Sequence, residues 1–152
     1  MAPLWRISTW LNTPAPIDLE AQRGYVVVAC AFQMLCPGCV THAIPQIKAV
    51  HELFVPQGVI VVGLHAVFEH HDAMTVTALR AFVHEYGIHF PVGVDTPADD
   101  GGSIPQTMAA YQMQGTPTLL LIDRAGRLRR LIFGHIPDLS LGAEIMRLVA
   151  EQ

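Results

Sequence analysis

A-C-A-F-Q-M-L-C-P-G-C-V-T-H, residues 29–42, joins an apolar run to a helical pattern through a Cys-Pro-Gly-Cys motif. Residues 25–32 are almost all apolar, which is typical of a central strand buried on both faces. After the motif, apolar residues recur at helical spacing as far as Phe54. Cys36 and Cys39 would lie at the start of this helix, where unpaired N–H groups and the helix dipole favour a thiolate. The stretch therefore predicts a reactive thiol with a resolving thiol beside it.

The same two cysteines are also half of a metal site. Cys-Pro-x-Cys is a common half-site for structural zinc, which needs two further ligands. The sequence has no second Cys-x-x-Cys, and His42 is the one further ligand close to the motif. The order strand, motif, helix favours a redox dithiol. A module that holds copper or zinc through Cys36, Cys39 and nearby histidines stays open as an alternative.

Length and composition indicate a single globular domain over residues 1–152, with residues 1–24 as a lead-in. A hydrophobic fraction of 51% and a charged fraction of 14% exclude disorder. The net charge of -4 gives no footprint for nucleic acid, and the apolar runs are too short to span a bilayer. The N-terminus lacks the apolar segment of a signal peptide, so we expect a cytoplasmic protein. Three cysteines fit one working pair plus a third thiol.

Further segments complete an α/β pattern. Residues 59–64 form a second buried strand, and the order strand, helix, strand predicts a parallel crossover. Pro45 should distort the helix between them. Thr75 is expected to cap a helix that ends at Gly87. The other expected elements are an edge element at 19–24, strands at 90–95 and 118–122, a hairpin partner at 127–133, a short helix at 105–113 and a final helix around 141–149.

Together these segments resemble the thioredoxin superfamily. Strand–CPGC–helix, Y-G-I-H-F-P-V at 86–92 and G-T-P-T-L-L-L-I-D-R-A-G-R-L at 115–128 are similar to its redoxin branch, the TlpA/ResA-like thiol-disulfide oxidoreductases. The resemblance implies a three-layer α/β/α fold with a central mixed sheet, an N-terminal extension and a βα insertion. It also implies that Cys36 is the nucleophile, that Cys39 is the resolving thiol, and that Thr116 and Pro117 form a cis peptide facing the dithiol and its substrate.

The resemblance further implies which molecules the protein meets. The expected partners are protein or small-molecule thiols and disulfides, together with a redox partner. No cofactor, nucleic acid or membrane is expected to take part.

Three positions depart from the family pattern. Cys30 stands where thioredoxins have a buried acid, His42 where TlpA/ResA-like proteins often have glutamate, and Leu35 where an aromatic residue usually precedes the motif. Cys30 is expected to be an inert core residue. For His42 two interpretations stay open, a group that tunes the thiols and an ordinary solvated helix histidine.

A histidine-rich loop follows the second strand. His65, His70 and His71 lie with Glu69 and Asp72 at the end of a parallel strand, where ligand sites of open sheets are found. Imidazoles and carboxylates suit zinc, copper or iron. A solvated loop is the more common explanation, so no metal is predicted and the three histidines are candidates only.

A peroxidase of the peroxiredoxin type is the weakest alternative. That motif has proline seven residues and threonine three residues before the reactive cysteine. Here these positions are Ala29 and Gln33.

Overall fold

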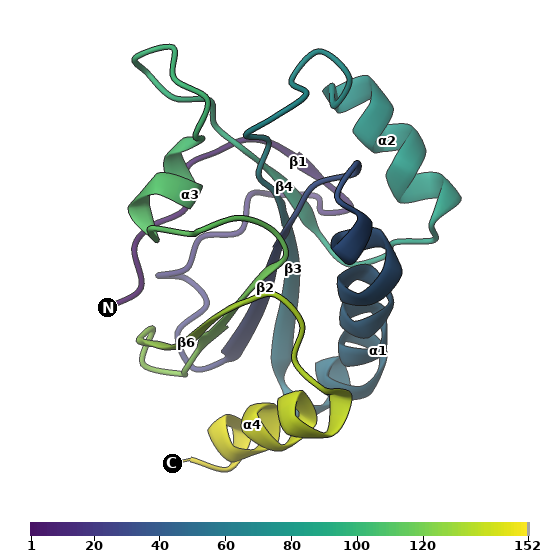
Figure 1. Ribbon diagram of the computed structural model, residues 1–152. Helices are drawn as coiled ribbons and strands as arrows, with labels where there is room; N and C mark the ends of the chain where they lie inside the picture. The colour runs from purple at the N-terminus through teal and green to yellow at the C-terminus, as the bar shows by residue number, and fades with distance from the viewer. Residues whose placement is uncertain (152) are drawn as a thin grey trace.

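The chain folds into a six-stranded mixed sheet with helices on both faces (Figure 1). The computed structural model describes residues 1–151. The strands lie in the order β1-β4-β3-β2-β5-β6. The elements are β1 (Ile7–Leu11), β2 (Val26–Phe32), η1 (Cys39–Ala43), α1 (Ile44–Phe54), η2 (Val55–Gln57), β3 (Val59–His65), α2 (Val76–Glu85), β4 (Val92–Asp95), α3 (Gln106–Ala110), β5 (Thr118–Ile122), β6 (Leu128–Phe133) and α4 (Asp138–Ala150).

Strand β2 occupies the centre of the sheet, and every one of its residues is buried. It pairs in parallel with β3 and antiparallel with β5. Strand β4 continues the parallel part on the other side of β3, whereas β5 and β6 form an antiparallel hairpin. The predicted α/β class and the mixed central sheet are therefore confirmed.

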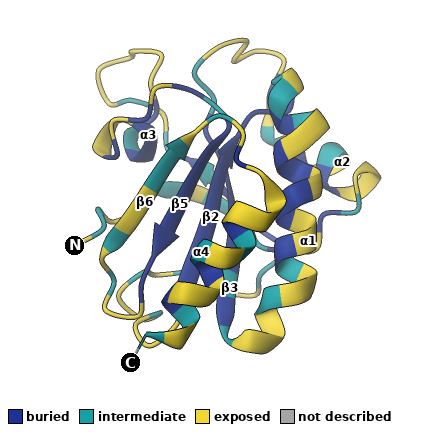
Figure 2. Cartoon of the chain, turned by 60° about the horizontal axis from the view of Figure 1, so that its bottom comes forward, coloured by how far each residue is buried: buried dark blue, intermediate teal, exposed yellow. Residues whose placement is uncertain are grey.

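The two faces of the sheet carry different layers. Helices α1, α2 and α4 share one apolar core with the β2 side chains of Val26, Val28, Cys30 and Phe32. On the opposite face, α3 and the N-terminal segment pack against Ala29 and Ala31. Figure 2 shows that the central strands are dark blue, hence buried, while each helix turns an exposed face to solvent. Within residues 1–151, no helix is both long enough and apolar enough to cross a membrane.

The N-terminal lead-in supplies an edge strand that the sequence did not indicate. β1 pairs antiparallel with β4, and Arg6 next to it donates its N–H to Thr107 Oγ1 at 2.8 Å. The edge element expected at residues 19–24 was wrong, because this segment forms hydrogen-bonded turns instead. Polar Ser8 and Thr9 interrupt the apolar pattern of β1, since an edge strand is covered on one side only.

The helix after the cysteine motif begins irregularly. Residues 39–43 form a π-helical turn, in which the N–H of Ile44 bonds to the carbonyl of Cys39. Helix α1 then starts, with Pro45 in its first turn. Proline has no N–H for the i−4 carbonyl, so the ordinary ladder cannot pass through this position. The distortion expected at Pro45 thus takes the form of a wider turn directly after the cysteines.

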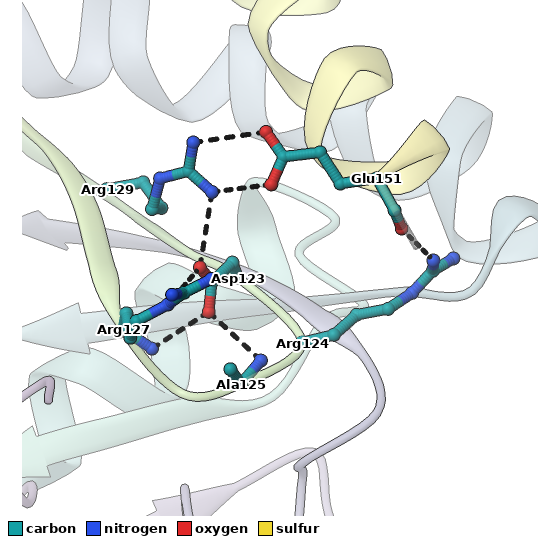
Figure 3. Close-up of polar contacts among 6 residues, drawn as sticks. All are labelled: Asp123, Arg124, Ala125, Arg127, Arg129 and Glu151. Carbon is teal, nitrogen blue, oxygen red and sulfur yellow. Dashed lines mark hydrogen bonds and ion pairs between the residues drawn. The ribbon is translucent and has the colours of Figure 1, made fainter.

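A buried carboxylate holds the turn between β5 and β6 (Figure 3). Asp123 accepts the backbone N–H groups of Ala125 and Arg127, each at 3.0 Å, and the side chains of Arg127 and Arg129 at 2.9 and 3.2 Å. Arg129 also reaches Glu151 beyond α4. Burial by itself would raise the pKa of Asp123, but these hydrogen bonds outweigh burial and hold the pKa below its ordinary value.

We expect Asp123→Asn to lower the free energy of unfolding near neutral pH by about 1–3 kcal/mol, because it removes a charged acceptor from buried donors. Since the folded pKa is depressed, the carboxylate stabilises the fold above the unfolded pKa of about 3.9 and stops doing so as the pH falls through the folded value. Urea unfolding should therefore show a wild-type advantage that shrinks below about pH 4. Asp72→Asn, an exposed site outside the network, is the control. An advantage that stays constant into acid would contradict the assignment.

Candidate active site

The two cysteines of the motif lie at the point where β2 gives way to helix. The N–H of Cys36 bonds to the carbonyl of Gln33 at 3.2 Å, which turns the chain, and helical backbone begins at Pro37. Cys36 is partly exposed, whereas Cys39 is buried. The N–H of Cys39 donates to Cys36 Sγ at 3.3 Å. The Cys39 N–H has no carbonyl partner at the start of the helix, so it points at Cys36 Sγ and stabilises negative charge there.

A second loop closes over the dithiol from a distant part of the chain. Cys36 Sγ donates to the carbonyl of Thr116 at 3.5 Å. The Thr116–Pro117 peptide bond is cis. Gly38 lies against the ring of Pro117, since a Cβ at Gly38 would be 3.6 Å from Pro117 Cδ. The structure therefore brings together the four residues that the sequence singled out, Cys36, Cys39, Thr116 and Pro117.

Burial makes the two thiols of the motif unequal. Burial, followed by the hydrogen bond with Cys36, raises the pKa of Cys39 to about 12. Hydrogen bonds from the Gln33 backbone and the Thr116 side chain lower the pKa of Cys39, but they do not offset burial. Cys39 is therefore a protonated thiol near neutral pH, and the partly exposed Cys36 is the sulfur of the pair that solvent reaches.

The third thiol, Cys30, is a core residue. It is buried among apolar side chains between β2 and the helices. Burial raises the pKa of Cys30 strongly, and the nearby sulfurs of Cys39 and Cys36 raise it further. A thiol in this environment neither gives up its proton near neutral pH nor meets solvent, so it does not replace the carboxylate that thioredoxins have at this position.

His42 lies on the π-helical turn and is exposed. Its ring centroid is 5.0 Å from that of His135, which lies in the loop before α4. Among the hydrogen bonds of residues 1–151, none joins the His42 imidazole to either sulfur. No sequence pattern indicated that His135 is a neighbour of His42. Only the fold brings the loop between β6 and α4 next to the π-helical turn.

The candidate metal ligands of the histidine-rich loop are not brought together. His65 is buried, and its Nε2 accepts the N–H of Met34 at 3.4 Å. His70 is exposed and has φ of 50°, and His71 Nε2 lies 3.2 Å from the carbonyl of Ser103. Over residues 1–151, no three His, Cys, Asp or Glu side chains are grouped closely enough to hold a metal ion.

Gln33 belongs to the site, although no sequence pattern indicated a role for it there. It is buried at the end of β2, and its Oε1 accepts the N–H of Phe68 at 3.1 Å. Its backbone carbonyl accepts the N–H of Cys36, and a hydrogen bond from its backbone lowers the pKa of Cys39. The signal in the sequence was a single amide side chain between an apolar strand and the cysteine motif, since a buried polar residue has to find partners.

A central mixed sheet, a Cys-x-x-Cys at a helix start and a cis-proline loop opposite it define a protein of the thioredoxin superfamily. The Redoxin family profile matches residues 2–141, and the chain belongs to this family. It is a thiol-disulfide oxidoreductase of the thioredoxin and redoxin type.

Solved structures agree with this assignment. A thioredoxin-like superfamily protein is 56% identical with a TM-score of 0.96, and the match covers 99% of this chain and 97% of the other. A thiol-disulfide isomerase from Corynebacterium glutamicum is 46% identical with a TM-score of 0.93, over 99% and 98% of the two chains. A thioredoxin-like protein solved in its oxidised form shares the fold at 21% identity, with a TM-score of 0.80 over 100% and 95%. No curated protein sequence matches the chain.

We expect iodoacetamide to label one cysteine of the native reduced protein near neutral pH. Cys36 should react because it is partly exposed, while burial protects Cys30 and Cys39. Mass spectrometry of native and urea-unfolded samples gives the count, and Cys36→Ser is the control that should remain unlabelled when folded. Rapid native labelling of Cys30 would contradict its burial in the core.

Proposed function

We propose that this enzyme exchanges disulfides through the dithiol Cys36 and Cys39, with Cys36 as the attacking sulfur. The observation that carries the proposal is the contact of the Cys39 N–H with Cys36 Sγ at 3.3 Å, on a sulfur that solvent reaches. A thiolate at a helix start is the usual form of an activated cysteine. The name of the 46% identical isomerase from C. glutamicum supports the same chemistry.

The reaction balances over two displacements. The Cys36 thiolate attacks one sulfur of a substrate disulfide, which forms a mixed disulfide and releases one substrate thiolate. Cys39 then loses its proton and attacks Cys36 Sγ, which forms the Cys36–Cys39 disulfide and releases the second substrate thiol. The substrate gains two electrons and the dithiol loses two. A partner dithiol restores the enzyme, and the same steps in reverse oxidise a substrate.

Substrates are proposed to dock around the exposed sulfur. Leu35 beside Cys36 is 57% exposed, and Phe133, which lies against Gly115, is 50% exposed. The carbonyl of Thr116 points at the dithiol from the facing loop. An apolar rim with a backbone acceptor suits an extended peptide that carries a cysteine. We propose protein or small-molecule thiols and disulfides as partners, no cofactor, and the cytoplasm as the compartment.

We expect Cys36→Ser to abolish the reduction of insulin by dithiothreitol-regenerated enzyme, because the nucleophile is lost. Cys39→Ser should instead accumulate a mixed disulfide, visible as an added mass that a reductant removes. Cys30→Ala is the matched control, because it removes a sulfur of the same chain but leaves both cysteines of the motif in place, and it should keep wild-type activity. Undiminished activity of Cys36→Ser would end the proposal.

His42 is proposed to tune this chemistry through its imidazole, in one of two protonation states. An imidazolium would favour the Cys36 thiolate, whereas a neutral imidazole is able to take the proton that Cys39 must lose. We expect His42→Ala to slow either the alkylation of Cys36 in acid or the resolution of the mixed disulfide near neutral pH. Stopped-flow rates across pH separate the two roles. His135→Ala is the control for the loss of the neighbouring ring, and unchanged rates in His42→Ala would make His42 a solvated surface residue.

A further inference from the structure

Two buried polar side chains hold the backbone that leads to Cys36, and disulfide exchange itself does not use them. Gln33 and His65 are each only 1% exposed. Gln33 directly follows β2, and His65 ends β3 at the position paired with Phe32. Because β2 and β3 run in parallel, both side chains lie at the same edge of the sheet. A buried polar group is tolerated where it is hydrogen-bonded, so its partners indicate what it does.

His65 bonds to the backbone two residues before the reactive cysteine. The N–H of Met34 donates to His65 Nε2 at 3.4 Å, and both residues are buried. An accepting Nε2 carries no hydrogen, so the neutral ring has its proton on Nδ1. Burial lowers the pKa of His65 to about 4, which keeps the acceptor in place near neutral pH. The ring lies 5.2 Å from that of Phe32, and this packing orients it.

Gln33 completes the attachment from the other side. Its carbonyl accepts the N–H of Cys36 at 3.2 Å, and its side-chain oxygen accepts the N–H of Phe68 at 3.1 Å. Its side-chain nitrogen lies 3.5 Å from Glu69 Oε1. The segment between β2 and the dithiol is therefore bonded to the end of β3 and to the loop after it, and it has little freedom to shift.

We propose that His65 is a positioning residue for disulfide exchange, which holds the Met34 amide and so keeps Cys36 Sγ against the N–H of Cys39. The proposal rests on the proposed function of the dithiol. An apolar side chain of similar size would fill the same space, but it would leave the buried Met34 N–H without an acceptor. The backbone would then shift to find a partner, and the reactive sulfur would move with it. Among the hydrogen bonds of residues 1–151, none joins the His65 ring to a sulfur, and its bond to the Met34 N–H is the route by which it acts.

The test compares two substitutions of His65. His65→Leu keeps the volume and removes the acceptor, whereas His65→Gln offers a side-chain oxygen at about the reach of Nε2. Val62→Ala is the control, because it weakens the same strand on the opposite face of the sheet. The measurements are the second-order rate of Cys36 alkylation by iodoacetamide, the disulfide equilibrium against glutathione and the thermal midpoint.

We expect His65→Leu to slow alkylation by about tenfold, the change that accompanies loss of one hydrogen bond to a charged group. Its equilibrium with glutathione should shift toward the disulfide, because the reduced form loses its stabilised thiolate. His65→Gln should stay within about threefold of wild type, and Val62→Ala should lower the thermal midpoint with an unchanged alkylation rate. A wild-type rate in His65→Leu, or a Gln variant as slow as the Leu variant, would overturn the proposal.

A measurement on the wild-type protein covers the case in which His65→Leu does not fold. Long-range ¹⁵N NMR of the imidazole shows which ring nitrogen carries hydrogen, and the proposal requires Nδ1–H with a bare Nε2. A proton found on Nε2 would overturn it, because that nitrogen would then be unable to accept from Met34. Wild-type enzyme that fails to reduce insulin would count against the proposed function alone, and the alkylation series would still test the position of Cys36.

Discussion

The complete burial of β2 sets the position of Cys36 Sγ. The strand is paired on both edges and covered on both faces, so it is unable to slide without moving the whole core. Strand β2 is closely enclosed by its neighbours. At Gly63 on β3, a Cβ would be 3.1 Å from the ring of Phe32 on β2 and 3.0 Å from that of Phe90. The chain leaves this strand at Gln33 and becomes helical at Pro37. Cys36 therefore has its place determined by residues that are buried in the core.

The same burial explains why the two thiols of the motif differ. One turn of chain separates a sulfur at the surface from a sulfur in the core. Burial and the hydrogen bond with Cys36 raise the pKa of the inner thiol, Cys39, to about 12. At Cys30, an apolar strand position takes the place of a buried acid. Its thiol stays protonated near neutral pH because burial raises its pKa, so it is unable to accept a proton there. In the proposed exchange, deprotonation of Cys39 thus has to rely on the hydrogen bonds from Thr116 and the Gln33 backbone that lower its pKa, or on a group that approaches from solvent.

Local patterns predicted most of the fold because they have local causes. Continuous apolar residues gave β2 and β3, and Thr75 does cap α2, its Oγ1 accepting the N–H of Ala78 at 3.2 Å. β1 was missed because its stability comes from pairing with β4, more than 80 residues away, rather than from its own pattern. The contact between His42 and His135 depends on the same kind of distant approach. Local sequence patterns do not show that two residues far apart along the chain lie close together in the fold.

The parallel strands share a feature that no single segment of sequence contains. At the carboxyl edge of β2, β3 and β4, a buried polar side chain takes backbone N–H groups that lie beyond the sheet. Gln33 accepts from Phe68, His65 from Met34, and Asp95 from Thr107 and Met108 at 2.7 and 2.9 Å. Where a loop leaves the edge of a sheet, its backbone N–H groups no longer have strand partners. An unpaired N–H in an apolar interior costs free energy. These side chains restore the bonds, and the edge that carries the dithiol is rigid because its loops are tied to buried groups.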